Sequence, residues 1–336
     1  MNTSDKRVTI RQVARLAGVS AMTVSKALNG KPGIAAETRE RVLAAAKELR
    51  YTPNLLAKSF RTARTNTIGV IMSSSFETVF TMLLDGIEEA AAEAGYSILL
   101  ATTRDDLDAE MAIIESMVRK RVDGLILTSS MVFSEKQRLL LERLGVPYIL
   151  TVRSYADPTV TTVHNDNYQG SFGLVDYLAK TGSRRFLFLS MLENRCSTTE
   201  RIRGWTDALK ANGLRFAPGS LVYLDHVEAA GYEATAARFA KGLPYDAIVC
   251  ATDLIALGAI NALRDKRIEI PRQVRVAGFN GIPLCPYFRV PLTTVEQPLY
   301  EIGKTGMRLL AEKISNPAAP PQKVVLENRL VIRQST

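Results

Sequence analysis

The residues best placed to do chemistry lie near the N-terminus, in the run Val19-Ser20-Ala21-Met22-Thr23-Val24-Ser25-Lys26-Ala27-Leu28-Asn29. If this run is helical, one of its faces carries small, polar and cationic side chains, namely Ala21, Met22, Ser25, Lys26 and Asn29. A lysine ammonium can donate to O6 and N7 of guanine, and alanine and methionine can pack against the methyl group of thymine. The spacing therefore predicts a face that fits the major groove of DNA.

Two short helices joined by a glycine must position this face. The expected apolar stripes are Val13, Leu16 and Ala17 in the first helix and Val24, Ala27 and Leu28 in the second. Gly18 suits the left-handed conformation that ends a helix, and Ser20 is a good N-cap for the next one. The pattern favours a helix-turn-helix, although any helix pair with a glycine turn would show similar spacing.

Positive charge is concentrated in the same part of the chain. The 336 residues carry a formal net charge of +9. Residues 1–66 hold 13 of the 43 Lys and Arg but only four of the 34 Asp and Glu, so the rest of the chain is electrically balanced. This distribution indicates a small head that binds a polyanion, attached to a neutral body. An anionic membrane is a weaker alternative, because no amphipathic segment presents a broad Phe, Trp or Leu face.

Composition argues against several other classes of protein. The cysteines Cys196, Cys250 and Cys285 form no CxxC pair, and the two histidines are too far apart to indicate a zinc site. We therefore expect no disulfide, no metal and no cofactor. The sequence contains no nucleotide-binding, nucleophile-elbow or metalloprotease motif, so we do not expect an enzyme. With no apolar leader and no membrane-length run, we expect a cytoplasmic protein that is nucleoid-associated when bound to DNA.

Three regions follow from the order of the expected elements. Residues 1–53, with a third helix at 37–50, are expected to form the helix-turn-helix headpiece. Residues 54–66 are expected to form a hinge helix and linker, and so short a helix needs DNA or a second chain to be stable. Residues 67–336 alternate buried strands with amphipathic helices in two series of four strands, followed by a closing strand at 324–332. This pattern predicts an α/β body with two lobes, each built on a doubly wound parallel sheet.

Taken in order, these pieces resemble the lactose/galactose repressor (LacI/GalR) family of bacterial transcription regulators. The resemblance covers essentially the whole chain. Its most specific parts are residues 19–29, Thr38-Arg39-Glu40-Arg41-Val42 and Tyr51-Thr52-Pro53-Asn54-Leu55-Leu56-Ala57. Arg201-Ile202-Arg203-Gly204-Trp205 and Pro291-Leu292-Thr293-Thr294-Val295 also match. The resemblance implies a homodimer with an all-α headpiece and a hinge helix. It also implies a body like that of a periplasmic sugar-binding protein, which binds a small effector between its lobes.

The resemblance also assigns DNA contacts to residues of the headpiece and hinge. It implies base contacts by Ala21, Met22 and Lys26, and phosphate contacts by Thr9, Ser20, Thr23, Ser25 and Asn29. In the hinge it implies minor-groove contacts by Ala57, Lys58 and Phe60. The family usually has leucine at the position of Phe60, as a wedge between base pairs. Phenylalanine could open a base step in the same way, or it could pack only against the partner chain.

The effector is expected to bind between the two lobes. The resemblance implies that Arg201 reaches the ligand, with Arg153 on the segment after the fourth strand. The family usually has an aspartate where this chain has Asn280. Keeping the arginine while losing a carboxylate favours a sugar acid or a phosphorylated sugar, and a neutral sugar with rearranged hydrogen bonds is the alternative. The other residues expected near the ligand are Ser74, Phe76, Phe80, Trp205 and Asp253. The two phenylalanines could instead belong to the lobe core.

The sequence thus predicts a DNA-binding transcriptional regulator that acts as a repressor on a pseudo-palindromic double-stranded operator. Its affinity for the operator is expected to change when a sugar, sugar acid or sugar phosphate binds. The alternatives are a cytoplasmic sugar-binding protein and a nucleoid-type DNA-binding protein without effector control. The first would not need a basic head, and the second would not need a two-lobed body.

Overall fold

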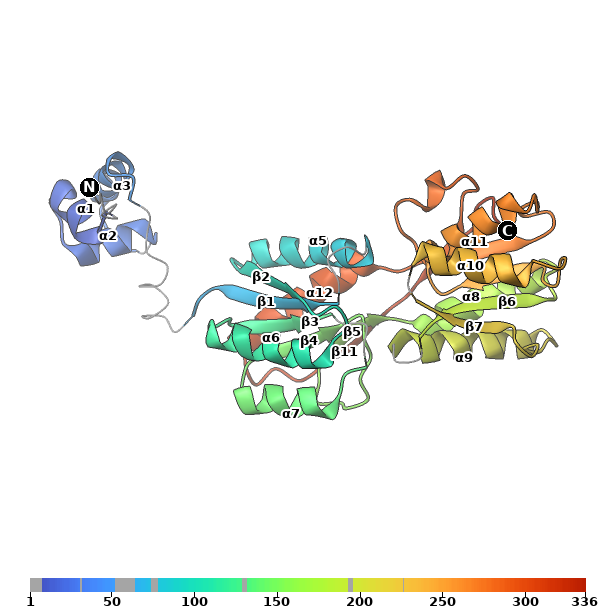
Figure 1. Cartoon of the computed structure of the whole chain (residues 1–336). Helices are drawn as coiled ribbons and strands as arrows, with labels where there is room; N and C mark the ends of the chain where they lie inside the picture. The colour runs from blue at the N-terminus through green and yellow to red at the C-terminus, as the bar shows by residue number, and fades with distance from the viewer. Residues whose placement is uncertain are drawn as a thin grey trace, which may run out of the picture. The chain divides into compact units, whose positions relative to one another are not determined.

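The computed structural model describes residues 8–30, 32–51, 64–73, 78–128, 132–192, 196–225 and 227–336. The chain divides into two compact units, Met1–Thr65 and Asn66–Thr336 (Figure 1). The three predicted hinge residues Ala57, Lys58 and Phe60 lie outside the described residues, and so do the predicted effector residues Ser74 and Phe76. Their roles therefore stay predictions.

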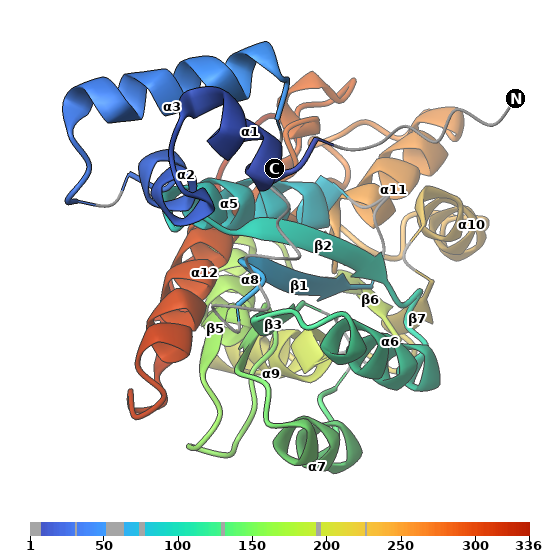
Figure 2. The same cartoon turned by 90° about the vertical axis from the view of Figure 1, so that its left-hand side faces the viewer.

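The described residues of the N-terminal unit form three helices, α1 (Ile10–Ala17), α2 (Ala21–Leu28) and α3 (Ala36–Glu48). Gly18 ends α1 at a φ of 67°, the left-handed conformation that glycine adopts without strain. Each helix contributes one valine to the core, and Val13, Val24 and Val42 have no exposed surface. Figure 2 shows α3 lying across α1 and α2, which fixes the angle between the two helices of the predicted motif.

One leucine of the expected apolar stripe points outward, so this part of the prediction is wrong. Leu16 is 48% exposed, whereas Ala14 is buried beside Val13 and Ala17. The inward face of α1 is therefore turned toward Ala14. Small side chains on the facing helices, such as that of Ala45, keep the helices close together and leave little room for a leucine between them.

The first lobe of the larger unit is a parallel sheet with the strand order β11-β5-β4-β3-β1-β2. Its strands are β1 (Thr67–Met72), β2 (Ser97–Thr102), β3 (Gly124–Leu127), β4 (Tyr148–Thr151), β5 (Thr162–Asn165) and β11 (Lys323–Leu326). Helices α5 (Thr78–Glu93) and α12 (Leu299–Ser315) cover one face, and α6 (Leu107–Arg119) and α7 (Glu135–Leu144) cover the other (Figure 1). The segments that follow these parallel strands therefore all leave from one edge of the sheet.

The second lobe repeats this plan with the strand order β12-β10-β9-β8-β6-β7, in which β12 runs antiparallel to β10. Its strands are β6 (Phe186–Met191), β7 (Leu221–Leu224), β8 (Ala247–Cys250), β9 (Arg275–Asn280), β10 (Thr293–Glu296) and β12 (Arg329–Val331). Helices α8 (Asn167–Lys180) and α9 (Cys196–Ala211) pack on one face, and α10 (Glu228–Arg238) and α11 (Asp253–Asp265) on the other. A short 3-10 helix, η1 (Cys285–Tyr287), lies between β9 and β10.

The chain crosses between the lobes three times, at residues 165–167, 296–299 and 326–329. The expected closing strand at 324–332 is therefore two strands, β11 in the first sheet and β12 in the second. Strands β5 and β10 were also not predicted, because they contain threonine, histidine, asparagine and glutamate instead of a continuous apolar run. In the part of the chain that the structure describes, each sheet consequently has six strands instead of the expected four.

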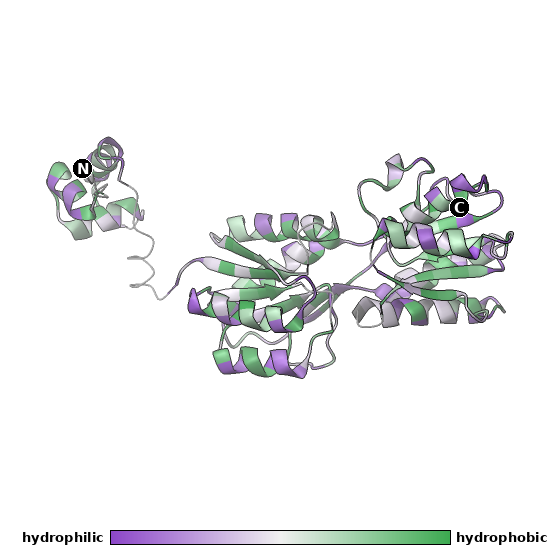
Figure 3. Ribbon diagram, viewed as in Figure 1, coloured by the Kyte–Doolittle hydropathy of each residue, from purple (hydrophilic) through white to green (hydrophobic). Residues whose placement is uncertain are grey.

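Apolar strands and close helix packing hold the first lobe together. In Figure 3 the strands of both sheets are mostly hydrophobic, while the helices alternate between polar and apolar residues. A Cβ atom added at Gly86 of α5 would lie 2.0 Å from the carbonyl oxygen of Tyr300 on α12, and one at Gly303 would lie 2.1 Å from that of Leu83. The two helices thus touch through their backbones. No helix among the described residues is long and apolar enough to cross a membrane.

Candidate functional site

Helix α2 presents a compact face to solvent on the N-terminal unit. Ser20 begins the helix, and its Oγ accepts a hydrogen bond from the Thr23 N–H at 3.1 Å. Met22 is 70% exposed and Lys26 is also exposed, while Ala21 is half-buried and packs partly against the core. The predicted base-contacting set therefore contains two exposed side chains and one half-buried side chain.

The predicted phosphate-contacting residues surround this face with hydroxyl and amide groups. Thr9, Ser20 and Asn29 are exposed, and Thr23 and Ser25 are half-buried. The Thr9 N–H donates to Gln12 Oε1 at 2.7 Å, in the capping box of α1, and Asn29 Nδ2 donates to the Ser25 carbonyl at 2.7 Å. Thr9 and Ser20 thus cap helix N-termini, which are favourable places for phosphate oxygens, whereas Asn29 caps the C-terminal end of α2.

The two lobes of the larger unit meet at a polar group of four residues, Ser154, Asn167, Glu200 and Arg201, which we call the Glu200 cluster. Ser154 Oγ, on the segment after β4, donates to Glu200 Oε1 at 3.1 Å and so joins the first lobe to α9 of the second. Asn167 Nδ2, at the start of α8, donates to Glu200 Oε2 at 3.2 Å. Glu200 was not among the predicted effector residues, because the motif pointed only to its neighbour Arg201.

Arg201 is fixed firmly inside the second lobe at 3% exposure. Its Nε donates to Asn167 Oδ1 at 2.9 Å, and its Nη1 donates to the Ala251 carbonyl at 2.5 Å. The guanidinium carbon lies 3.7 Å from the centre of the Phe279 ring, which is a cation–π contact. These contacts hold the arginine charge next to Glu200 at the place where the lobes meet.

Asp253 and Asn280 hold the loop that follows β9. The Asp253 carboxylate has no exposed surface and accepts from the Thr294 hydroxyl at 2.6 Å and from the Ile282 N–H at 2.9 Å. Burial raises the pKa of Asp253 to about 6, and the hydrogen bond from Thr294 opposes this shift. Asn280 adopts a φ of 120°, and its Oδ1 accepts from Gln297 Nε2 at 2.7 Å, which ties the ends of β9 and β10 together.

Arg153 lies inside the first lobe with no exposed surface. It forms an ion pair with Glu110 of α6 at 2.7 Å, and its guanidinium lies 5.4 Å from the centre of the Phe133 ring. The preceding residue, Val152, has a φ of 69°, which is rare for a β-branched side chain. The charge of Arg153 is thus compensated within its own lobe.

Two aromatic residues of the predicted effector set are core residues in the structure. Phe80 is 3% exposed in the apolar cluster beneath α5. Trp205 has no exposed surface and stacks on Phe188 with ring centres 5.0 Å apart. Because the helix faces that carry both side chains point toward the sheets, their predicted effector contacts find no support in the structure.

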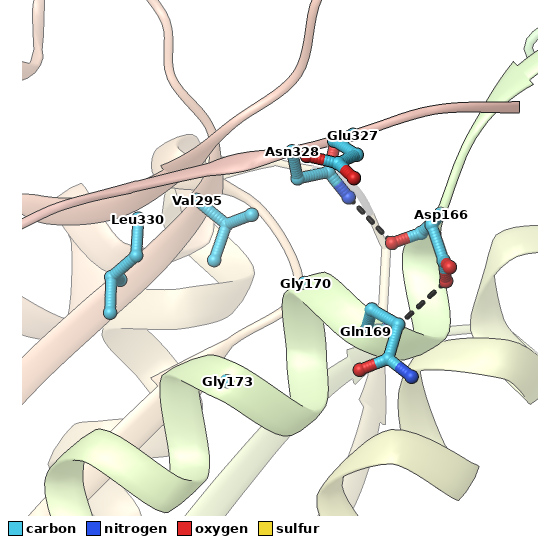
Figure 4. A pocket seen from close by; sticks show the side chains of 8 residues that line it. All are labelled: Asp166, Gln169, Gly170, Gly173, Val295, Glu327, Asn328 and Leu330. Atoms are coloured by element: carbon cyan, nitrogen blue, oxygen red, sulfur yellow. Dashed lines mark hydrogen bonds between the residues drawn. The ribbon is translucent and has the colours of Figure 1, made fainter.

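A cavity of about 420 Å³ lies beside two of the crossing segments (Figure 4). Asn328 Nδ2, from the third crossing, donates to the Asp166 carbonyl in the first crossing at 2.6 Å, and the Gln169 N–H donates to Asp166 Oδ1 at 2.8 Å. A Cβ atom at Gly170 would lie 2.6 Å from Asn328 Nδ2, so a side chain at this position would displace the asparagine amide. None of the described residues of the predicted effector set lines this cavity. Its lining includes residues of the first and third crossings between the lobes.

Comparison with known proteins matches both units of the chain. Residues 9–54 match the model for bacterial regulatory proteins of the lacI family, and residues 175–336 match that for a periplasmic binding protein-like domain. The chain is 34% identical to the HTH-type transcriptional regulator RegA of Clostridium saccharobutylicum, over 97% of this chain and 98% of that protein. It is 32% identical to catabolite control protein A of Priestia megaterium, over 98% and 99% of the two chains.

Solved structures give the same result. The lac repressor dimer bound to operator and the anti-inducer ONPF matches with a TM-score of 0.89 at 26% identity, covering 98% of this chain and 99% of that one. A complex of the transcriptional regulator CelR with cellobiose matches with a TM-score of 0.75 at 30% identity, covering 98% and 100%. Since relatives above 30% identity span nearly the whole sequence, the chain belongs to the lacI family of bacterial regulatory proteins.

Proposed function

We propose that the protein is a transcriptional repressor whose affinity for a pseudo-palindromic operator is controlled by a sugar-type effector bound between the lobes. The observation that carries the proposal is the α2 face, where Met22 and Lys26 are exposed on the unit that holds the excess positive charge. In this proposal residues 1–53 are the headpiece, 54–66 the hinge and linker, and 67–336 the effector-binding and dimerisation domain. The relatives named above are regulators, and we propose no catalytic role.

In the proposed complex α2 lies in the major groove. Lys26 donates to guanine, Met22 and Ala21 contact thymine methyl groups, and the hydroxyl and amide groups around the face bind phosphates. The hinge residues Ala57, Lys58 and Phe60 contact the minor groove between the two half-sites. Base readout in each half-site then depends more on apolar contact than on paired hydrogen bonds.

The Met22→Ala substitution is expected to relax base preference at one position in each half-site. The thioether is 70% exposed and carries no part of the core, so its loss should leave folding intact while it removes an apolar contact to the base. Selection of binding sites from a randomised pool of duplexes measures this effect. Leu43→Ala is the matched control, because Leu43 is 48% exposed and belongs to α3 instead of α2. An unchanged consensus for Met22→Ala would refute its role.

A second copy of the chain is the proposed partner of the body. The solved lac repressor relative is a dimer, and this chain exposes two large apolar side chains beside η1, with Leu284 54% and Tyr287 83% exposed. We expect Tyr287→Glu to shift the protein toward monomer and to weaken operator binding. Light scattering coupled to size exclusion gives the mass. Leu139→Glu on α7, where Leu139 is 52% exposed, should remain dimeric. A dimeric Tyr287→Glu variant would place the interface elsewhere.

Effector control requires that a change between the lobes reaches the start of the body. The Asn66 N–H donates to Asp123 Oδ2 at 2.8 Å, and the Asn66 carbonyl accepts from the Ser97 N–H at 2.8 Å. The entry of the chain is thus fixed to the first lobe. An effector that binds one lobe arrangement more tightly shifts the population toward or away from the DNA-competent form.

The proposal as a whole is tested by electrophoretic shift on short palindromic and scrambled duplexes, with and without a panel of sugars. We expect salt-sensitive binding that is selective for one palindrome and that changes when one sugar is added. Sugar binding without any shift would indicate a sugar-binding protein. A shift that depends neither on sequence nor on sugar would indicate a nucleoid-type protein.

A further inference from the structure

We infer that Glu200 determines the charge of the effector, and that the site selects an uncharged polyhydroxylated ligand over a sugar acid or sugar phosphate. The inference rests on the proposed function, because it concerns the effector of that same site. It reverses the preference that the sequence alone suggests, which counted Arg201 and the missing carboxylate at Asn280 but not Glu200.

The other charged groups of the predicted effector set are already compensated. Arg153 is paired with Glu110 at 2.7 Å inside the first lobe, and both side chains are at most 2% exposed. Asp253 has no exposed surface, and both of its carboxylate oxygens accept hydrogen bonds from its own lobe. Among the described charged residues of that set and of the Glu200 cluster, this leaves Arg201 and Glu200, which are sequence neighbours of opposite charge. A ligand there meets a balanced pair.

The Glu200 carboxylate retains capacity to accept further hydrogen bonds. Its side chain is half-buried, and Ser154 and Asn167 each donate to a different carboxylate oxygen. A carboxylate offers about four lone-pair sites, so the hydroxyl groups of a ligand can be accepted in addition to these two donors. The two donors also hold the carboxylate in a fixed orientation.

A second acceptor near this cluster also needs a donor. Asn165 has no exposed surface, and its Nδ2 donates to Asn167 Oδ1 at 3.3 Å. Its own Oδ1 is buried and has no hydrogen-bond partner among the described residues. Sugar hydroxyl groups can donate to the half-buried Glu200 carboxylate, whereas an ionised carboxylate or a fully ionised phosphate has no proton to donate to it. A negative group close to Glu200 would also be repelled.

The test is calorimetry on the full-length protein with pairs of probes that differ in one ionised group: glucose and glucuronate, galactose and galacturonate, cellobiose and cellobionate. In the pair that the protein binds, we expect the neutral sugar to bind at least tenfold more tightly than the acid. Glu200→Gln keeps the shape of the side chain and removes its charge, so this ratio should fall about tenfold. Glu233→Gln, which removes an exposed carboxylate from α10, should leave the ratio unchanged.

Two outcomes would overturn the inference: tighter binding of the acidic member by the natural chain, or an unchanged ratio in a Glu200→Gln variant with a normal melting temperature. If that variant does not fold, the ratio measured on the natural chain decides alone. Neutral-sugar selectivity without operator binding would support the inference and refute the proposed function. Operator binding that responds to a sugar acid but not to its neutral counterpart would support the proposed function and refute the inference.

Discussion

Glu110→Ala is expected to lower the free energy of unfolding by about 3–5 kcal/mol, the range observed when one partner of a buried ion pair is removed. The substitution leaves the Arg153 guanidinium inside the first lobe, where neither member of the pair is more than 2% exposed. A buried cation without its carboxylate must be rehydrated or must disrupt the packing around it. Chemical denaturation followed by circular dichroism measures the loss.

Glu115→Ala is the matched control for this prediction. Glu115 lies on the same helix and forms ion pairs with Arg119 at 3.7 Å and with Arg143 at 3.6 Å, but these side chains are 42–71% exposed. Exposed pairs contribute only about 0–1 kcal/mol. Replacing both Glu110 and Arg153 with methionine should recover most of the loss, because no charge is then left buried. Equal losses of unfolding free energy in Glu110→Ala and Glu115→Ala would contradict the prediction that the buried pair contributes more to stability than the exposed pairs.

Asp253 is expected to make the protein less stable as the pH rises from about 4 to about 6. Its pKa is about 6 in the folded chain, against an ordinary value of 3.8, because the carboxylate is buried. Within this window the folded chain retains a proton that the unfolded chain releases, so stability is greatest below the window and is lost as the pH rises through it. Raising the pKa of Asp253 from 3.8 to about 6 corresponds to roughly 3 kcal/mol.

The Asp253→Asn variant isolates this contribution, because asparagine has nearly the same shape and does not titrate. Between pH 4 and pH 6 the free energy of unfolding of the natural chain should fall relative to that of Asp253→Asn. Asp176→Asn is a control of opposite sign, because the hydrogen bond from Lys180 lowers the pKa of Asp176. Parallel stability curves for the natural chain and Asp253→Asn would contradict the prediction.

The features that could be predicted from sequence were those set by local patterns. Gly18 and Ser20 fixed the turn between α1 and α2, and the long apolar runs located most strands of both sheets. The failures came from tertiary packing. Leu16 has the right spacing for the core, yet the close approach of the helices favours Ala14 there. Residues 324–332 look like one strand in the sequence, but they contribute β11 to the first sheet and β12 to the second.

The candidate effector site was harder to predict, because its residues are polar groups brought together from distant segments. Arg201 was predicted from its motif, and the structure adds that Asn167 and Phe279 hold its guanidinium. Glu200 received no attention because its significance depends on Ser154, which is 46 residues away in sequence. Distances of this kind follow from how the two lobes meet, and no local periodicity encodes them.

The interleaved path of the chain has a consequence for synthesis on the ribosome. Helix α12 and strand β11 belong to the first lobe, yet they are made after every strand of the second lobe except β12. The apolar surface of α5 that α12 covers, including Leu83 and Ile87, therefore stays open until residues 299–315 have emerged. During most of translation the nascent chain therefore exposes this apolar surface, and we expect it to bind chaperones.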